Sequence, residues 1–314
     1  MSRLEETFTI DISRRVMASE FRIILGATDE YYARQVAEAA LDEVTRLEKV
    51  LNCFDPTSEI SYVNGNAYEK NIAVSPDLFE ILQLSLKLYR ETCGAFDVTA
   101  GRIIDLWRSA EKSGFEPDAK TIREAAALVG MQHVTLDDKA GTVRFERRGL
   151  LINLGGIGKG YAVRKAASIL KEYGIPFALI SSGNSTIYAL GTPPNEKNWR
   201  IGIRHPSKPA ERIAVVELVD GALSTSGGPQ QRDEFVAELY EHIIDPLTGE
   251  PAQSGLVSAS VITQDPAIAD ALSTTFYLKG KAYATEYCKT HEGVKAILVE
   301  EIEKGMYTIQ TGGG

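Results

Sequence analysis

The stretch INLGGIGKGYAV, residues 152–163, carries four glycines within six positions, at 155–160. It lies between an apolar strand-like run and a helical pattern, and many strand-like runs follow it. Glycines let a backbone come close to a ligand, and the free N–H groups of a helix start beside Lys159 favour an anion such as a phosphate. A tight strand-to-helix turn explains the same glycines equally well. The phosphate-loop pattern fails because Gly160, and not Ser or Thr, follows the lysine, and the glycine spacing also fails the dinucleotide fingerprint.

Helical patterns dominate the chain before this stretch. Apolar residues recur at spacings of three and four over residues 36–51, which predicts a half-buried amphipathic helix. Ser75 is a typical N-cap and Pro76 a typical first residue for a second helix that reaches residue 88. A third helix is expected near 117–128, before Gly130.

Strands dominate elsewhere, with few helices between them. We expect strands at 22–25, 134–136, 142–145, 151–154, 177–181, 186–190, 199–203, 213–218, 222–225, 257–262, 296–300 and 306–309, and helices at 161–173, 266–278 and up to about 290. Runs of consecutive strands between helices favour an α+β fold, a mainly antiparallel mixed sheet packed with helices, over a doubly wound sheet. No linker divides the chain, so we expect one domain over 1–314 with its core at about 16–310.

Composition excludes several functional classes. The 314 residues carry 34 basic and 43 acidic side chains, a net charge of −9, and 44% are hydrophobic. No apolar run approaches the roughly 20 residues that a membrane span needs, and no basic block suggests nucleic-acid binding. Three scattered cysteines do not make a disulfide framework or a zinc cluster. The start MSRLEETFTI shows no leader or lipid-attachment signal, so we expect a cytoplasmic protein, or an exported one if a leader was removed.

Asp270 and Thr274 form a second candidate site. They stand four residues apart in a predicted helix and therefore share one of its faces. A carboxylate and a hydroxyl are hard oxygen donors suited to Mg²⁺. Helix capping by an early Asp is the commoner use of such a residue and stays open at this point.

His242 begins a third candidate, HIIDPLTG, in which Asp-Pro and Thr-Gly steps indicate a turn. An imidazole is the usual general base near neutral pH, although a surface histidine at a strand end fits equally. The turns GAFDVT and TSGG, at 94–99 and 225–228, could be ordinary turns. Four aromatic residues could stack on a planar ring or fill the core: Phe54, Tyr62, Phe96 and Trp107.

The order of these segments resembles the ApbE family of flavin transferases, the FAD:protein FMN transferases, over about residues 16–309. The matching segments are VMAS at 16–19, DPTSEISYVN at 55–64, GAFDVTAGRIIDLW at 94–107, INLGGIGKGYAV at 152–163, TSGG at 225–228, HIIDPLTGEP at 242–251 and ADALSTTFYLKG at 269–280. The resemblance implies an ApbE-like (T-fold-like) α+β fold.

The resemblance also implies roles for single residues. Asp270 and Thr274, with the backbone carbonyl of Gly156, would hold Mg²⁺, and His242 would take part in the transfer. The implied contacts to FAD, the substrate, are Met17, Phe54, Ala95, Phe96, Asp97, Asn153, Lys159 and Ile243.

The implied reaction moves FMN from FAD to a Ser or Thr hydroxyl of an acceptor flavoprotein and releases AMP. The same metal site would serve a pyrophosphatase that cleaves FAD to FMN and AMP. A non-catalytic flavin-binding protein is a third possibility. It is favoured by Asn153 where the family commonly has Asp and by 228–229 (Gly-Pro) where Asp-Tyr often follows, while the intact set Asp270, Thr274 and His242 argues against it. Phe54 also departs from the family, which frequently has Tyr there.

Overall fold

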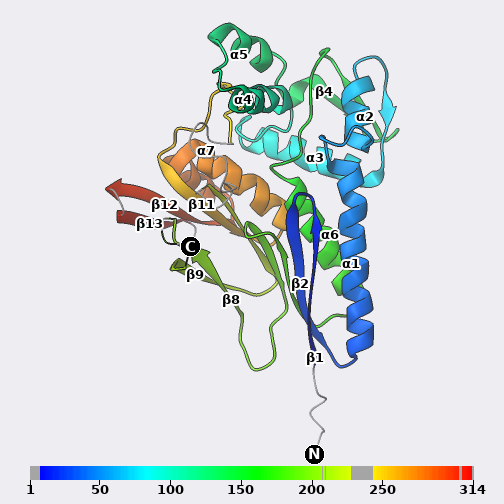
Figure 1. Cartoon of the computed structure of the whole chain (residues 1–314), viewed down its shortest axis with the longest axis vertical. Coiled ribbons are helices and arrows are strands. Elements are labelled where there is room, and N and C mark those ends of the chain that lie inside the picture. Colours follow the sequence, from blue (N-terminus) through cyan, green and yellow to red (C-terminus); the bar gives the residue numbers. More distant parts are fainter. Residues whose placement is uncertain (1–7, 207, 209, 228–242, 304–305, 313–314) are drawn as a thin grey trace, which may run out of the picture.

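An eight-stranded antiparallel sheet forms the centre of the protein (Figure 1). The computed structural model describes residues 8–206, 208, 210–227, 243–303 and 306–312. The strand order in the large sheet is β1-β2-β6-β7-β10-β11-β12-β13. Their bounds are β1 (Phe8–Val16), β2 (Ser19–Ala27), β6 (Phe177–Ser182), β7 (Thr186–Leu190), β10 (Gly221–Gly227), β11 (Leu256–Thr263), β12 (Lys295–Glu303) and β13 (Met306–Gly312). The expected α+β class with a mainly antiparallel sheet is confirmed.

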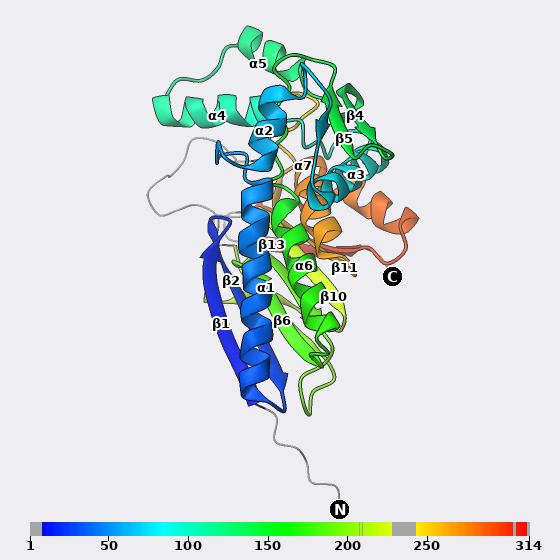
Figure 2. The ribbon, with the colours of Figure 1, turned by 90° about the vertical axis from the view of Figure 1, so that its right-hand side faces the viewer.

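Three helices cover one face of this sheet: α1 (Glu30–Leu51), α6 (Gly158–Glu172) and α7 (Pro266–Thr290) (Figure 2). The hairpin of β8 (Trp199–Arg204) and β9 (Arg212–Leu218) packs on the other face. Side chains alternate between the two faces along each strand. In β10, Ala222 belongs to the helix-side core and Leu223 to the core under the hairpin.

The remaining elements gather at one end of the molecule, at the top of Figure 1. They are α2 (Glu59–Asn66), α3 (Pro76–Glu91), α4 (Gly101–Ser113), α5 (Ala119–Ala126), the 3₁₀ turn Met131–His133, and a small sheet of β3 (Ile72–Ala73), β4 (Val134–Asp137) and β5 (Thr142–Phe145). The predicted hairpin across residues 137–141 is the antiparallel β4–β5 pair.

Local sequence explains where the main helices begin. Asp29 caps α1 by accepting the Tyr32 amide, and Ser75 caps α3 by accepting the Leu78 amide, with Pro76 in the first turn. The helix α7 is interrupted at Gly280, which has φ of 78°, so the two helices expected there are joined across a kink. The start of α3 and the break in α7 agree with the sequence prediction, whereas α1 begins six residues before the predicted 36–51.

Several elements differ from the prediction. Residues 151–154 form only one bridge, Ala100 with Leu151, and no strand. Five described elements are not among those expected: the helices α2 and α4, the short strand β3, the 3₁₀ turn Met131–His133, and the edge strand β1, which adds buried Ile10 to the core ahead of residue 16. Short amphipathic helices and a charged edge strand give weak periodic signals, because few of their side chains are buried. Within the described residues, the helices lack the length and apolarity needed to cross a membrane.

Candidate active site

The start of α6 lies against α7. Ile157 precedes α6 and supplies no side-chain cap, and the amide of Gly160 donates instead to Oδ2 of Asp270 at 2.9 Å. A Cβ at Gly160 would overlap the carbonyl oxygen of Pro266 and lie 2.7 Å from Cβ of Asp270. Only glycine therefore permits this close approach, which brings together the glycine turn and the Asp270 helix that the sequence separates by 110 residues.

Asp270 is buried inside the protein and is not a helix cap. The cap of α7 is Asp265, whose side chain accepts the Ala267 amide at 2.8 Å. Asp270 is only 5% exposed, and this burial raises the pKa of its carboxyl, while the nearby charge of Lys159 and the Gly160 hydrogen bond act to lower it. Oδ1 accepts hydrogen bonds from Thr186 at 3.2 Å and Ser224 at 3.3 Å. Capping is thus excluded as the use of Asp270.

Thr274 and Gly156 add two further oxygens. Thr274, half-buried one turn beyond Asp270, has its hydroxyl 3.1 Å from Oγ of Ser226. In a continuing helix the Gly160 amide would bond the carbonyl of Gly156, but Asp270 takes that amide. Among the residues that the structure describes, the Gly156 carbonyl accepts no backbone hydrogen bond outside regular elements.

This donor set fits a hard divalent cation. A carboxylate, a hydroxyl and a backbone carbonyl are ligands that Mg²⁺ accepts, with water or phosphate completing its coordination. The described residues contain no group of three or more His, Cys, Asp or Glu side chains that could hold a metal. A site for a soft metal such as zinc therefore has no support in the described part of the chain.

The turn that carries Ala95, Phe96 and Asp97 lies beside the glycine turn. The Asn153 amide donates to the carbonyl of Val98 at 2.7 Å, and a Cβ at Gly156 would lie 3.5 Å from the ring of Phe96. Asn153 also accepts the Gly155 amide at 2.8 Å through its side chain. Two stretches of the resemblance, 94–99 and 152–163, are therefore neighbours in space.

Ala95 and Phe96 are buried, and Asp97 is half-buried. Burial raises the pKa of Asp97 to about 6, although hydrogen bonds from the amide and hydroxyl of Thr99, at 2.8 and 2.6 Å, act to lower it. Asp97 is thus a carboxyl that titrates near neutral pH beside the glycine turn.

Lys159 and Met17 occupy different surroundings. The side chain of Lys159 is half-buried and close enough to Asp270 to act on it electrostatically. Within the described part of the chain, the Lys159 ammonium group has neither a hydrogen bond nor an ion pair. Met17 lies in the two-residue turn between β1 and β2 with φ of 52°, and its amide donates to Glu48 of α1 at 2.8 Å. This turn needs positive φ at both central residues, so Met17 is held in a conformation that is unfavourable for a non-glycine residue.

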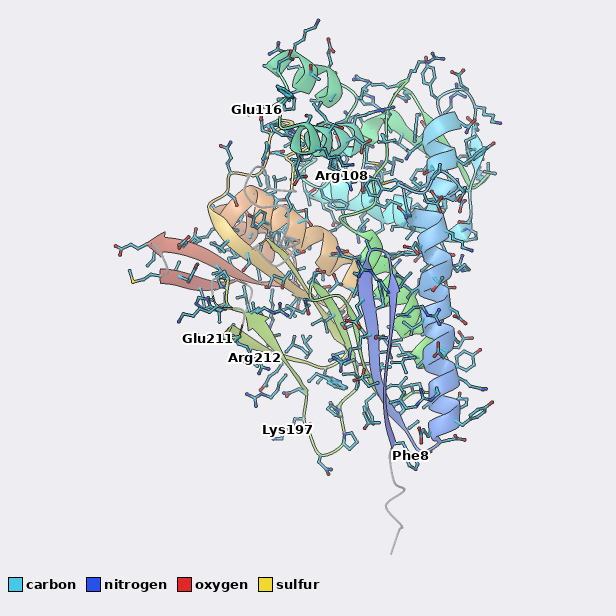
Figure 3. All side chains as sticks on the ribbon, in the orientation of Figure 1. Phe8, Arg108, Glu116, Lys197, Glu211 and Arg212 are labelled. Atoms are coloured by element: carbon cyan, nitrogen blue, oxygen red, sulfur yellow. The ribbon has the colours of Figure 1, made fainter. Side chains whose placement is uncertain are left out.

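Phe54 lies on the surface, 57% exposed, at the end of α1. The guanidinium of Arg108, on α4 in Figure 3, lies 4.1 Å from the centre of its ring. Within the described part of the chain, no contact links the Phe54 ring to the residues around Asp270, so its role in binding FAD stays a prediction. Arg108 is absent from the sequence prediction because the helix that carries it was not expected. Of the other aromatic candidates, Tyr62 is exposed, while Trp107 is buried.

His242 lies outside the described residues, as do residues 228–229. The next residue, Ile243, is half-buried against the main core, and its carbonyl accepts the Ala252 amide at 2.9 Å. The predicted turn is present: the Gly249 amide donates to the Asp245 carbonyl at 2.7 Å. Nε1 of Trp107 donates to the Gly249 carbonyl at 2.7 Å and ties this turn to α4.

Four buried hydroxyl residues surround Asp270: Thr186, Ser224, Ser226 and Ser273. Ser226 belongs to the TSGG candidate of the sequence analysis, which gave Thr186, Ser224 and Ser273 no role of their own. The sequence holds one signal for Ser224 and Ser226. They stand on either side of Thr225 in a strand pattern, which places both side chains on the same face of the sheet.

Comparison with known proteins identifies the family of this chain. The model of the ApbE family matches residues 11–298. The chain is 26% identical over 299 residues to an FAD:protein FMN transferase of Klebsiella pneumoniae (strain 342), covering 94% of this chain and 85% of that protein. It is 29% identical over 291 residues to an FAD:protein FMN transferase of Treponema pallidum (strain Nichols), covering 86% and 80%.

Solved structures show the same fold. The ApbE protein of Thermotoga maritima superposes with a TM-score of 0.85 at 26% identity, with 97% of each chain covered. The apo flavinyl transferase ApbE of Pseudomonas stutzeri gives a TM-score of 0.86 at 23% identity, covering 99% of this chain and 96% of that one. With the family model spanning most of its length, the chain belongs to the ApbE family.

Proposed function

We propose that this protein transfers FMN from FAD to a Ser or Thr hydroxyl of an acceptor flavoprotein, in a Mg²⁺-dependent reaction that releases AMP. Membership of the ApbE family and relatives named FAD:protein FMN transferases support the flavin transfer. The observation that carries the proposal is the bond from Gly160 to Asp270, because it joins an anion-binding helix start to a carboxylate. Membership and geometry thus lead to the same reaction class, phosphoryl transfer.

The residues around this bond have separate tasks. Asp270, Thr274 and the carbonyl of Gly156 would hold the cation. When bound, Mg²⁺ neutralises charge that develops on the transferring phosphoryl group. Lys159 and the N–H groups at the start of α6 favour the negatively charged diphosphate of FAD.

The flavin side of the site would be formed by the neighbouring turn. Phe96 presents an aromatic ring next to Gly156, and Asp97 and Asn153 supply polar atoms beside it. We assign Met17, Phe54, Ala95 and Ile243 to the same binding function, on the resemblance alone. Together these side chains would orient FAD so that one phosphorus faces the acceptor hydroxyl.

The transfer itself needs a base. The acceptor oxygen forms a bond to the phosphorus on the FMN side, the bond from that phosphorus to the bridging oxygen breaks, and AMP leaves with the electron pair. We assign to His242 the role of the base that accepts the proton of the acceptor hydroxyl. A positioned base contributes roughly 10²–10⁴-fold to such a step, because a neutral hydroxyl is a poor nucleophile.

Release of AMP from FAD tests this proposal. The purified protein is incubated with FAD and Mg²⁺, with and without an acceptor flavoprotein, and AMP, free FMN and protein-bound flavin are measured by chromatography and in-gel fluorescence. We expect AMP and acceptor-bound flavin in equal amounts, both abolished by EDTA. Free FMN without acceptor would instead identify a pyrophosphatase, and bound FAD without AMP a flavin-binding protein.

The His242→Ala variant tests the base. It should still bind FAD but release AMP roughly 10²–10⁴-fold more slowly. The matched control is His291→Gln, at the C-terminal end of α7, where the ring stacks on Tyr287 with ring centres 3.7 Å apart. Transfer by His242→Ala at the wild-type rate would show that His242 is not the base.

A further inference from the structure

A row of hydroxyl groups runs between the two side chains assigned to the cation. It comprises Thr186 of β7, Ser224 and Ser226 of β10, and Ser273 of α7, which lie between Asp270 and Thr274. Thr186 and Ser224 are directly opposite each other in the β7–β10 pair, and residues 224 and 226 share the face of β10 that contacts α7. The sheet thus presents hydroxyl groups to the 270–274 turn of α7.

The first part of the row fixes the Asp270 carboxylate. Thr186 and Ser224 each have one hydroxyl proton, and an ionised carboxylate can only accept. Both hydroxyls lie within donating distance of Oδ1, at 3.2 and 3.3 Å, and their own oxygens are 3.1 Å apart, while among the described residues Oδ2 receives the Gly160 amide at 2.9 Å. One acceptor position of Oδ2 is left for another partner.

The second part of the row engages the hydroxyl of Thr274. The oxygens of Thr274 and Ser226 are 3.1 Å apart, those of Ser226 and Ser273 are 2.8 Å apart, and Ser273 donates to the Asp270 carbonyl at 2.9 Å. Since Ser273 gives its single proton to that carbonyl, Ser226 can donate to Ser273 and accept from Thr274. The Asp270 carbonyl, 3.4 Å from the Thr274 hydroxyl, is a second acceptor for the Thr274 proton, and with the proton given to either oxygen both lone pairs of Thr274 are available.

We propose that Thr186, Ser224 and Ser226 are positioning residues that orient Asp270 and Thr274 for a divalent cation. The proposal rests on the metal site of the proposed function and adds residues that touch neither cation nor FAD. Hydrogen-bond partners of metal ligands typically change metal affinity by roughly 10–100-fold when removed. All three are at most 7% exposed, so water does not readily replace their hydroxyls.

Binding of Mn²⁺ alone to the full chain tests the proposal. Mn²⁺ prefers the same oxygen ligands as Mg²⁺, and its free-ion paramagnetic resonance signal falls on binding. Binding that is lost in Asp270→Asn defines the site and separates it from ions on the acidic surface. We expect Ser226→Ala and the double variant Thr186→Val with Ser224→Ala to weaken this binding roughly 10–100-fold.

The strand β10 offers a matched control. The hydroxyl of Thr225 points to the opposite face and lies 2.8 Å from Oγ of Ser260. Thr225→Val removes a hydroxyl of the same strand without altering the row. It should leave the Mn²⁺ affinity within about twofold of wild type, far less than the roughly 10–100-fold loss expected for the row variants. Melting temperatures in EDTA identify any variant that fails to fold.

Conservative changes keep the test decisive. Thr186→Ser retains the hydroxyl and should bind Mn²⁺ as the wild type does, whereas Thr186→Val, of nearly the same shape, should not. Folded row variants with wild-type affinity would overturn the positioning role, as would a Ser variant as weak as the Val variant. Absence of any Asp270-dependent binding in the wild type would overturn the metal site itself, and with it the proposed function.

Discussion

At the scale of single residues, the buried carboxylate of Asp270 depends on the absence of a side chain at Gly160. Asp270 has three hydrogen-bond donors, and one of them is the amide of Gly160. Any larger residue at 160 would separate α6 from α7 and remove that donor. The glycine of the turn is therefore required by packing as well as by access to a ligand.

Replacing Gly160 by Ala tests this requirement. The added Cβ meets backbone atoms of α7, so we expect a loss of about 1–3 kcal/mol in the free energy of unfolding, together with weaker Mn²⁺ binding. The control is Gly65→Ala in α2, where nothing lies within 4 Å of the added Cβ. It should be neutral or stabilise by up to about 1 kcal/mol in urea unfolding. Equal stability of the two variants would refute the packing role of Gly160.

Asp97 predicts a pH effect. Its pKa is about 6 in the folded protein and near 3.8 in the unfolded chain, so between these values only the folded state holds the proton. Stability from this group is therefore fully present below about pH 4 and is lost as pH rises through 6. Asp97→Asn should match the wild type at low pH and exceed it by up to about 3 kcal/mol above pH 6, in urea unfolding. Parallel pH curves for the two proteins would contradict the shift.

At the scale of elements, the sequence predicted those parts whose signals are local. The helix α3 follows from Ser75 and Pro76, and the β4–β5 hairpin from its turn. The helix α4 has no side-chain cap, so its start is set by tertiary contacts such as the bond from the Gly101 amide to Leu151. The hydroxyl row joins three elements far apart in sequence, which spacing alone does not reveal. The FAD and His242 assignments came from the resemblance and not from periodicity.

The contact between α4 and the 243–252 turn predicts a local effect. Trp107→Phe removes the donor to the buried Gly249 carbonyl, which should cost about 1–3 kcal/mol and speed hydrogen exchange in 243–252. Trp199→Phe is the control, because Nε1 of Trp199 is 3.4 Å from the Leu190 carbonyl, in a half-buried place under the hairpin. Trp199→Phe should cost less stability than Trp107→Phe, and it should speed hydrogen exchange only in the β8–β9 hairpin. Unchanged exchange in 243–252 for Trp107→Phe would show that the turn is held by other contacts.

At the scale of the whole molecule, the large sheet separates two environments. Helices cover the face that carries Asp270's partners, and the β8–β9 hairpin covers the other. The charged residues Glu211 and Arg212 lie at the turn of this hairpin, and Lys197 lies at its opposite end, just before β8 (Figure 3). The candidate site lies where α6, α7 and the 94–99 turn meet. Its residues come from most of the length of the chain, so correct assembly of the fold is a condition for the proposed activity.

The most direct test of flavin transfer is the intact mass of an acceptor flavoprotein co-expressed with this chain. With the wild type, we expect the acceptor to gain the mass of one FMN less one water, on a Ser or Thr that fragmentation identifies. With Asp270→Asn, or without the chain, the acceptor should keep its unmodified mass. An acceptor that stays unmodified beside the folded wild type, or that is modified equally by Asp270→Asn, would contradict the proposed reaction.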